Sequence, residues 1–88
     1  MATVTFTVLF FASAREAVGQ PSTTFTLPST PPPTVRSLVA AIVAQYGRLQ
    51  PLMAHMLLAV NREYESADSE RVLSGSEEIA FIPPLSGG

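Results

Sequence analysis

The chain has 88 residues, enough for one small domain with a modest core but too few for a core plus an elaborate catalytic cleft. Its net charge of -2 provides no basic surface for a phosphate backbone, so we expect no nucleic-acid partner. The absence of cysteine excludes disulfides, thiolate catalysis and cysteine-ligated zinc. No apolar run reaches the length of a membrane span and no signal-peptide pattern opens the chain, so we expect a cytosolic protein without a membrane partner.

Two alternating segments near the N-terminus predict a pair of strands. Apolar side chains share one face of residues 3–11: Val4, Phe6, Val8 and Phe10. Residues 22–27 alternate in the same way, with Thr23, Phe25 and Leu27 expected to point inward. A helical turn over residues 12–18, ended by Gly19, joins the two segments. Because the connection is so short, we expect the strands to pair antiparallel.

The central segment predicts the main helix. Thr34 follows a proline-rich connector, residues 28–33, and stands where an N-cap belongs. Apolar residues then follow at helical spacing: Val35, Leu38, Val39, Ile42, Val43 and Tyr46. Gly47 is a plausible stop. We expect this helix to cover one face of the sheet.

The C-terminal half adds two further strands. Residues 56–61 form a compact apolar run typical of a buried strand, and residues 78–82 predict the last strand. Between them lies a polar connector, residues 64–76, predicted to be irregular and anchored to the core by Val72 and Leu73. The order strand, strand, helix, strand, strand predicts an α+β fold of the β-grasp (ubiquitin-like) kind, a mixed sheet with its first and last strands parallel at the centre. We expect a domain over residues 1–82 and an extended tail over residues 83–88.

The predicted strands leave apolar side chains on the face away from the helix. Ala80 and Ile82 of the last strand face outward there, beside Leu9 and Phe11 of the first strand. Together they predict one exposed apolar patch that leads toward the tail. Such a patch usually makes a protein contact, although the tail or a second copy is an alternative cover.

The chain ends in Gly87-Gly88, a carboxylate on a backbone without side chains. Such an end can pass through a narrow cleft into the active site of another protein. Pro83 and Pro84 limit the conformations of the tail and so reduce the entropy lost when it is inserted. The terminus itself is therefore the prime candidate for the chemistry.

Three segments resemble the small subunits of molybdopterin synthase. They are the opening Val8-Leu9-Phe10-Phe11-Ala12 with Arg15-Glu16 and Gly19, the middle Ala59-Val60-Asn61, and the ending from Glu78 to Gly88. The resemblance covers almost the whole chain at compatible spacing. One departure is Ser76, which stands where the family often has glycine, while Gly75 lies one residue earlier.

The resemblance implies a carrier of sulfur. An adenylating partner that uses ATP and magnesium would activate the Gly88 carboxylate, because a free carboxylate is a poor electrophile, and sulfur transfer would then leave a thiocarboxylate. In the synthase, two such tails deliver sulfur to a cyclic pyranopterin monophosphate to form the molybdopterin dithiolene. A large subunit supplies the substrate pocket, in a heterotetramer of two small and two large subunits. The carrier itself holds no permanent cofactor.

The resemblance also implies roles for neighbouring residues. Gly87 lets the tail enter a tunnel too tight for a β-carbon, and Leu85 and Ser86 contact the tunnel wall. Arg15 is implied to meet a partner, and the interface is implied to involve the outward patch: Leu9, Phe11, Ala80 and Ile82.

Other candidate sites and functions stay open at this stage. The only histidine, His55, has no companions for a metal site, so we expect no metal. Four acidic residues are expected to be solvated or turn-forming rather than an acid/base pair: Asp68, Glu70, Glu77 and Glu78. The alternatives to a molybdopterin carrier are a sulfur carrier for thiazole synthesis, a ubiquitin-like protein modifier and an interaction domain without tail chemistry.

Overall fold

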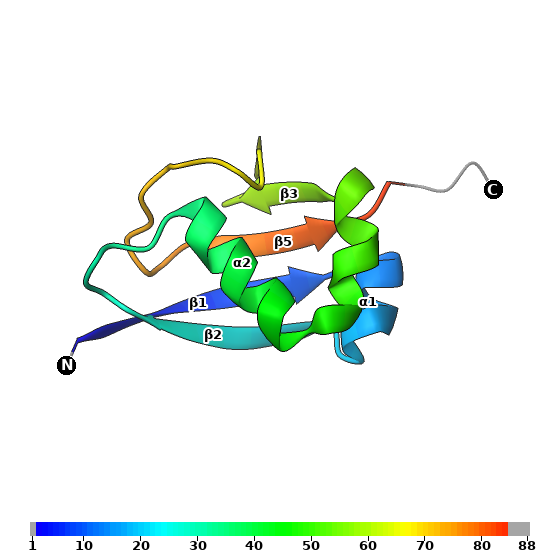
Figure 1. The fold of residues 1–88 in the computed structure, drawn as a ribbon, viewed down its shortest axis with the longest axis horizontal. Coiled ribbons are helices and arrows are strands. Elements are labelled where there is room, and N and C mark those ends of the chain that lie inside the picture. Colours follow the sequence, from blue (N-terminus) through cyan, green and yellow to red (C-terminus); the bar gives the residue numbers. More distant parts are fainter. Residues whose placement is uncertain (1, 85–88) are drawn as a thin grey trace.

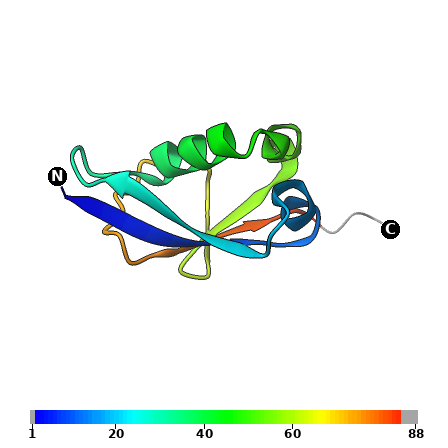
Figure 2. The same ribbon diagram turned by 90° about the horizontal axis from the view of Figure 1, so that it is seen from below.

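The computed structural model describes residues 2–84, in which a mixed sheet carries a layer of helices on one face (Figures 1 and 2). Its elements are β1 (Thr3–Phe10), α1 (Ala12–Val18), β2 (Ser22–Pro28), α2 (Val35–Gln45), the 3-10 helix η1 (Gly47–His55), β3 (Leu57–Val60), β4 (Glu63–Glu65) and β5 (Glu78–Ile82). The strands lie in the order β2-β1-β5-β3-β4. Strands β1 and β5 pair in parallel at the centre, and every other neighbouring pair is antiparallel. The predicted β-grasp arrangement is confirmed.

The core lies between the sheet and α2, where the alternation of β1 meets the apolar stripe of the helix. Fully buried side chains come from both layers: Phe6, Val8, Phe10, Val35, Leu38, Ile42, Leu49, Val60, Ile79 and Phe81. Phe10 is at the centre of an aromatic group, with ring centroids 5.6 Å from Phe81 and 5.8 Å from Tyr46. Burial of these rings supplies much of the hydrophobic stabilisation.

The start of α2 is capped as predicted, and the amides beside the cap tie the helix to the polar connector of residues 64–76. The Ser37 amide donates to Thr34 Oγ1 over 3.1 Å, while the Thr34 amide donates to Ser37 Oγ over 2.8 Å. The next free amides, of Val35 and Arg36, donate to carbonyls of the connector over 3.1 and 3.0 Å. The N-terminal amides of this helix are therefore satisfied from within the chain.

Two local expectations were wrong. The connector that was expected to be irregular contains a short strand, β4, which pairs antiparallel with β3. Leu73 is buried as expected, but Val72 is 62% exposed, because successive side chains of an extended backbone point in opposite directions and only one can enter the core. Gly47 follows Tyr46, the C-cap residue of α2, so the helix ends where expected, and Gly47 also opens η1.

The connector is closed before β5 by the buried carboxylate of Glu77. Its oxygens accept hydrogen bonds from the amides of Ser74, Gly75 and Ser76 over 2.8 to 3.2 Å, and from the Ser74 hydroxyl over 3.0 Å. Burial alone raises the pKa of Glu77, but these hydrogen bonds favour the charged form and bring the net pKa below its usual value. Glu77 is therefore turn-forming, as expected, and it is also almost fully enclosed.

Gly75 is required by the backbone conformation and the packing of this connector. Its φ is +107°, and a β-carbon there would lie 2.7 Å from Cβ of Val4. Only glycine tolerates both the conformation and the close approach. Ser76, the next residue, does not have positive φ.

We predict that Gly75→Ala lowers the free energy of unfolding by about 2 to 4 kcal/mol, the sum of a strained φ and a clash with Val4. Denaturant unfolding measures this loss. Gly47→Ala is the matched control, because a β-carbon at Gly47 meets no atom within 4 Å. Equal stability of the two variants would contradict the steric account.

We predict that Glu77→Gln costs about 1 to 3 kcal/mol at pH 7, because an amide cannot accept all four donors. Since the folded pKa of Glu77 lies below that of the unfolded chain, the carboxylate stabilises the fold above about pH 4.5 and loses this effect as the pH falls through the folded pKa. The difference in melting temperature between wild type and Glu77→Gln should therefore shrink below pH 4.5. Glu16→Gln removes the same charge from an exposed site on α1 and should change the melting temperature little at any pH. A difference that stays constant down to pH 2 would rule out the carboxylate as its source.

Candidate functional site

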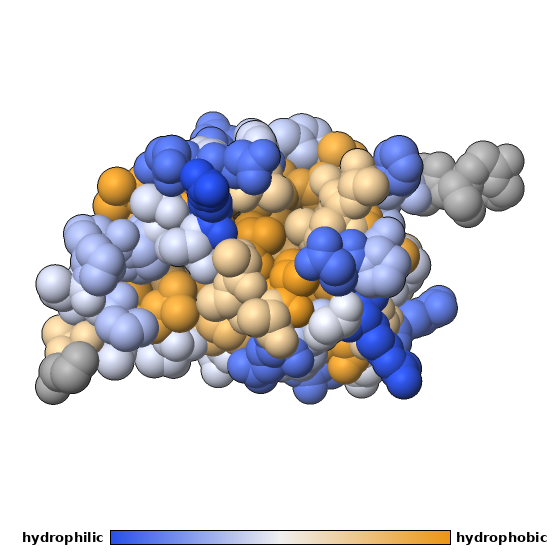
Figure 3. All heavy atoms as spheres, viewed as in Figure 1, coloured by the Kyte–Doolittle hydropathy of each residue, from blue (hydrophilic) through white to orange (hydrophobic). Residues whose placement is uncertain are grey.

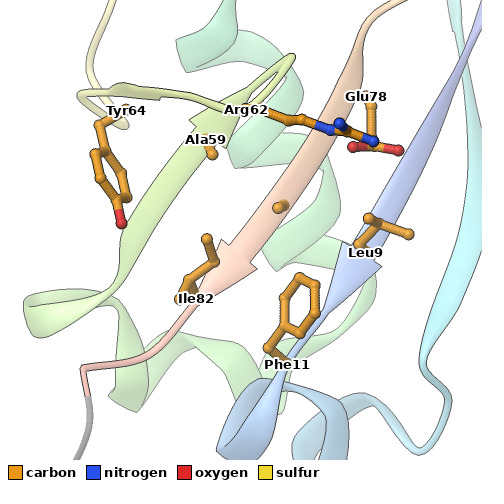
Figure 4. A pocket seen from close by; sticks show the side chains of 8 residues that line it. Leu9, Phe11, Ala59, Arg62, Tyr64, Glu78 and Ile82 are labelled. Atoms are coloured by element: carbon orange, nitrogen blue, oxygen red, sulfur yellow. The ribbon is translucent and has the colours of Figure 1, made fainter.

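The face of the sheet opposite α2 holds a shallow apolar pocket of about 430 Å³ (Figure 4). Its lining comes from four strands and the adjoining turns: Leu9, Phe11, Ala59, Arg62, Tyr64, Glu78, Ala80 and Ile82. We call this set the open-face pocket. It contains the four outward residues that were expected to form an apolar patch, so the structure brings Leu9, Phe11, Ala80 and Ile82 together.

Strand register shapes the open-face pocket. Leu9 lies beside Ala80 in the parallel pair of β1 and β5, and Ala80 lies beside Ala59 in the antiparallel pair of β5 and β3. The two alanines form a low floor between larger side chains. Phe11 is 47% exposed and Tyr64 is 74% exposed, so two aromatic rings are available for contact at the margins.

One end of the open-face pocket is polar. Asn61 and Arg62 turn the chain from β3 to β4 with φ values of +51° and +70°. Asn61 fixes this turn to β5 by two hydrogen bonds. Its backbone amide donates to the Glu78 backbone carbonyl over 2.8 Å, and its side-chain Oδ1 accepts from the Glu78 backbone amide over 2.9 Å. The side chains of Arg62 and Glu78 extend toward each other over that end (Figure 4). The pocket therefore combines an apolar floor with two opposite charges at one margin.

Tyr64 is held in place through the residue that follows it. Glu65 lies on the other side of β4, where it accepts hydrogen bonds from Ser69 Oγ over 2.6 Å and from Arg71 Nη1 over 3.4 Å. The Ser69 hydroxyl and the Arg71 charge bring the pKa of Glu65 below its usual value, although desolvation opposes them. These bonds tie the short edge strand to the connector and so fix the backbone that carries Tyr64.

The predicted tail begins at the apolar end of the open-face pocket. The Phe11 amide donates to the Phe81 carbonyl over 3.1 Å, which keeps the ends of β1 and β5 together. Pro83, half-buried, and Pro84, exposed, follow Ile82 directly. The remaining tail residues that were singled out lie outside the described residues: Leu85, Ser86, Gly87 and Gly88.

Arg15 stands apart from the open-face pocket. It is exposed on α1 and lines a separate hollow with Glu16, Gly19 and Gln20. Its predicted contact with a partner therefore needs a surface beyond the apolar patch.

Four residues that line the open-face pocket were not predicted from the sequence as part of the site: Ala59, Arg62, Tyr64 and Glu78. The available signal was the Tyr between two Glu residues directly after a two-residue turn, which is a hairpin pattern.

The other features of the described chain offer no catalytic constellation. Over residues 2–84, no three His, Cys, Asp or Glu side chains gather as a metal site. No helix of that part is long and apolar enough to cross a membrane. On the helix side, apolar side chains gather over α2 and η1 (Figure 3), and a second groove there is lined mainly by small or apolar residues, including Val39, Val43 and Met53.

Comparison with known proteins places the chain in a family. Residues 8–88 match the ThiS family. A molybdopterin synthase sulfur carrier subunit of Chlamydomonas reinhardtii is 37% identical over 92% of this chain and 95% of its own length, and that of Drosophila yakuba is 40% identical over 92% and 88%.

Solved structures show the same fold at lower identity. SAMP1 from Haloferax volcanii has a TM-score of 0.82 at 21% identity, covering 96% of this chain and 99% of its own. A putative molybdopterin converting factor subunit 1 from Pyrococcus furiosus has a TM-score of 0.79 at 23% identity, covering 93% and 99%. Since the family match and the curated relatives both span nearly the whole sequence, the chain belongs to the ThiS family, as a relative of the molybdopterin synthase sulfur carrier subunits.

Proposed function

We propose that this protein is the sulfur carrier subunit of a molybdopterin synthase. The observation that carries the proposal is the identity of 37 to 40% to proteins of that name across 92% of the chain. The open-face pocket supports it, because an exposed apolar surface lies where β5 passes into Pro83 and Pro84. A carrier needs this combination of a surface that docks on a partner and a tail that leaves from its margin.

The proposed chemistry takes place on the Gly88 carboxylate. Attack of that carboxylate on the α-phosphorus of ATP, with magnesium, releases pyrophosphate and gives an acyl adenylate on an adenylating partner. Displacement of AMP by sulfide, or by a persulfide whose S–S bond a thiol then reduces, leaves the thiocarboxylate. Its sulfur attacks a carbon of the cyclic pyranopterin monophosphate, and a C–S bond forms there as a C–O bond of that carbon breaks, the oxygen leaving on the phosphate or as water. Hydrolysis of the resulting thioester link then leaves the sulfur on the pterin and returns the carboxylate. Two carriers supply the two sulfurs of the dithiolene.

The proposed partner at the open-face pocket is the large subunit of the synthase. Aromatic side chains at a docking surface often contribute most of the binding energy, and Phe11 and Tyr64 are the exposed rings here. The charges of Arg62 and Glu78 at one margin favour a single orientation of the partner. That orientation would direct the tail, which begins at the opposite, apolar end, into the partner's substrate pocket.

Deletion of Gly88 tests the role of the tail. We predict that the deleted protein retains its melting temperature and its affinity for the large subunit, but gains no sulfur on incubation with an adenylating enzyme, ATP, magnesium and a sulfur donor. Intact-mass spectrometry measures the loading as replacement of one oxygen by sulfur. Dithiolene formation by the deleted protein with purified partners would refute the proposal.

The same mass measurement separates the alternatives for the wild-type chain. A thiocarboxylate supports a sulfur carrier, whereas an isopeptide link to a lysine of another protein supports a modifier. A thiocarboxylate that forms dithiolene only with the large subunit supports the molybdopterin assignment over a carrier of thiazole synthesis.

Phe11→Ser tests the docking surface. Phe11 is the N-cap residue of α1, a position that serine favours, so the substitution removes the exposed ring while leaving the helix start intact. We predict about tenfold or greater loss of affinity for the large subunit by titration calorimetry, as for an aromatic hot spot. Val72→Ser is the matched control, since Val72 is 62% exposed but lies outside the open-face pocket. Equal affinities of the two variants would place the interface elsewhere.

A further inference from the structure

The two edges of the sheet differ in how they are protected against pairing with another strand. Strand β4 at one edge is three residues long and carries glutamate at both ends. Strand β2 at the other edge is seven residues long and carries no charge: Ser22, Thr23, Thr24, Phe25, Thr26, Leu27 and Pro28. Short strands and charges are the usual safeguards of an edge, so only β4 is safeguarded along its length.

The backbone of β2 presents groups along this edge that no other strand pairs; the Thr24 carbonyl accepts a bond of 3.3 Å from the Thr23 hydroxyl. The Phe10 amide donates to the Pro21 carbonyl over 2.9 Å, and the Ser29 amide donates to the Ala2 carbonyl over 3.1 Å. These bonds show which alternate residues of β2 face β1 in the antiparallel ladder. Thr23, Phe25 and Leu27 are the residues whose backbone groups hydrogen-bond to β1. The amides and carbonyls of Ser22, Thr24 and Thr26 therefore face away from β1. Figure 2 looks at the molecule from this side and shows β2 along the near edge of the sheet.

The same strand from a second copy complements this edge. With the two β2 strands antiparallel and Thr24 opposite the second copy's Thr24, Ser22 lies opposite Thr26, and all outward donors and acceptors find partners. Pro28, which lacks an amide hydrogen, stays outside this ladder. No charge opposes another charge within it.

Side chains agree with the pairing on both faces. On the open face, Thr5 and Thr26 already share a hydrogen bond of 3.0 Å between their hydroxyls, and Ser22 of the second copy would add a third hydroxyl to this row. The neighbouring row, Thr7 and Thr24, would continue into Thr24 of the second copy. On the helix side, Phe25 is half-buried and would lie beside Thr23 of the second copy. A β2 strand thus offers its copy the alternation of threonine and apolar residues that β1 already offers to β2.

We propose that the β2 edge is a self-association surface, at which two copies pair antiparallel about Thr24 into one continuous sheet. The open-face pocket stays free, because it is lined from β1, β5, β3 and β4 and not from β2. The two β5 strands run in opposite directions in such a pair, so the segments that begin at Pro83 leave from opposite ends. Self-association and docking of a partner at the open-face pocket are therefore compatible.

Sedimentation equilibrium between about 10 µM and 1 mM tests the proposal, since edge pairing of this kind is expected to be weak. The weight-average mass of wild type should rise from 9.4 kDa toward twice that value. Thr24→Lys and Thr24→Glu should each weaken association by about threefold or more, because like charges then face each other across the two-fold axis. An equimolar mixture of the two variants should associate again. Thr7→Lys is the matched control, placing the same charge on the cross-strand neighbour of Thr24 that is not at the edge.

Amide hydrogen exchange on the same samples reports the site of contact. The Thr24 and Thr26 amides should exchange more slowly as the concentration of wild type rises, while the Thr23 and Phe25 amides, bonded to β1, stay slow throughout and report an intact fold. A mass that remains at 9.4 kDa up to about 1 mM would overturn the proposal, as would association without protection of Thr24 and Thr26. Protection of these amides only when the large subunit is added would assign the edge to that partner instead of a second copy.

Discussion

Parallel pairing of β1 with β5 is the constraint on which the rest of the molecule depends. It joins the two ends of the chain at the centre of the sheet, and parallel strands need a long crossover, which α2 and η1 supply. The register of this pair places Phe10 beside Phe81 on the core side and Leu9 beside Ala80 on the open side. One set of backbone hydrogen bonds therefore builds both the core and the surface that we propose for docking. It also brings the start of the tail beside Phe11.

The helices cover only one face of the sheet, so the other face stays open. Side chains divide this open face into a polar half and an apolar half. Along β1 the outward side chains change from Thr3, Thr5 and Thr7 to Leu9, with Phe11 following the strand. The threonines keep one half of the face hydrated, whereas the other half forms the floor and margin of the open-face pocket. Because the apolar half lies toward the end of β5, contact with a partner is confined to the region where the tail begins.

Sequence patterns predicted the elements that bury one face against the opposite layer of the fold, because such burial produces a regular apolar spacing. Alternation fixed the inward face of β1, and the stripe and Thr34 cap located α2 to within a residue or two. Strand β4 escaped prediction because it is three residues long and polar at both ends, so its existence depends on the turn at Asn61 and on the bonds of Glu65. With β4 missed, Tyr64 and Arg62 could not be assigned to the site. The enclosure of Glu77 was equally out of reach, since it arises from three amides that converge only in the folded turn.

The difference between the two sheet edges follows from what each edge adjoins. Strand β4 borders the open-face pocket through Tyr64, and a strand added there would lie at the margin of the docking surface; its short length and its glutamates oppose such an addition. Strand β2 lies at the far side of the sheet, where pairing obstructs neither the pocket nor the end of β5. Protection is therefore found where an added strand would compete with the proposed function. The uncharged edge, β2, lies where pairing with a second copy would not cover the open-face pocket. Self-association through β2 is therefore compatible with a carrier that must release its tail to one partner after another.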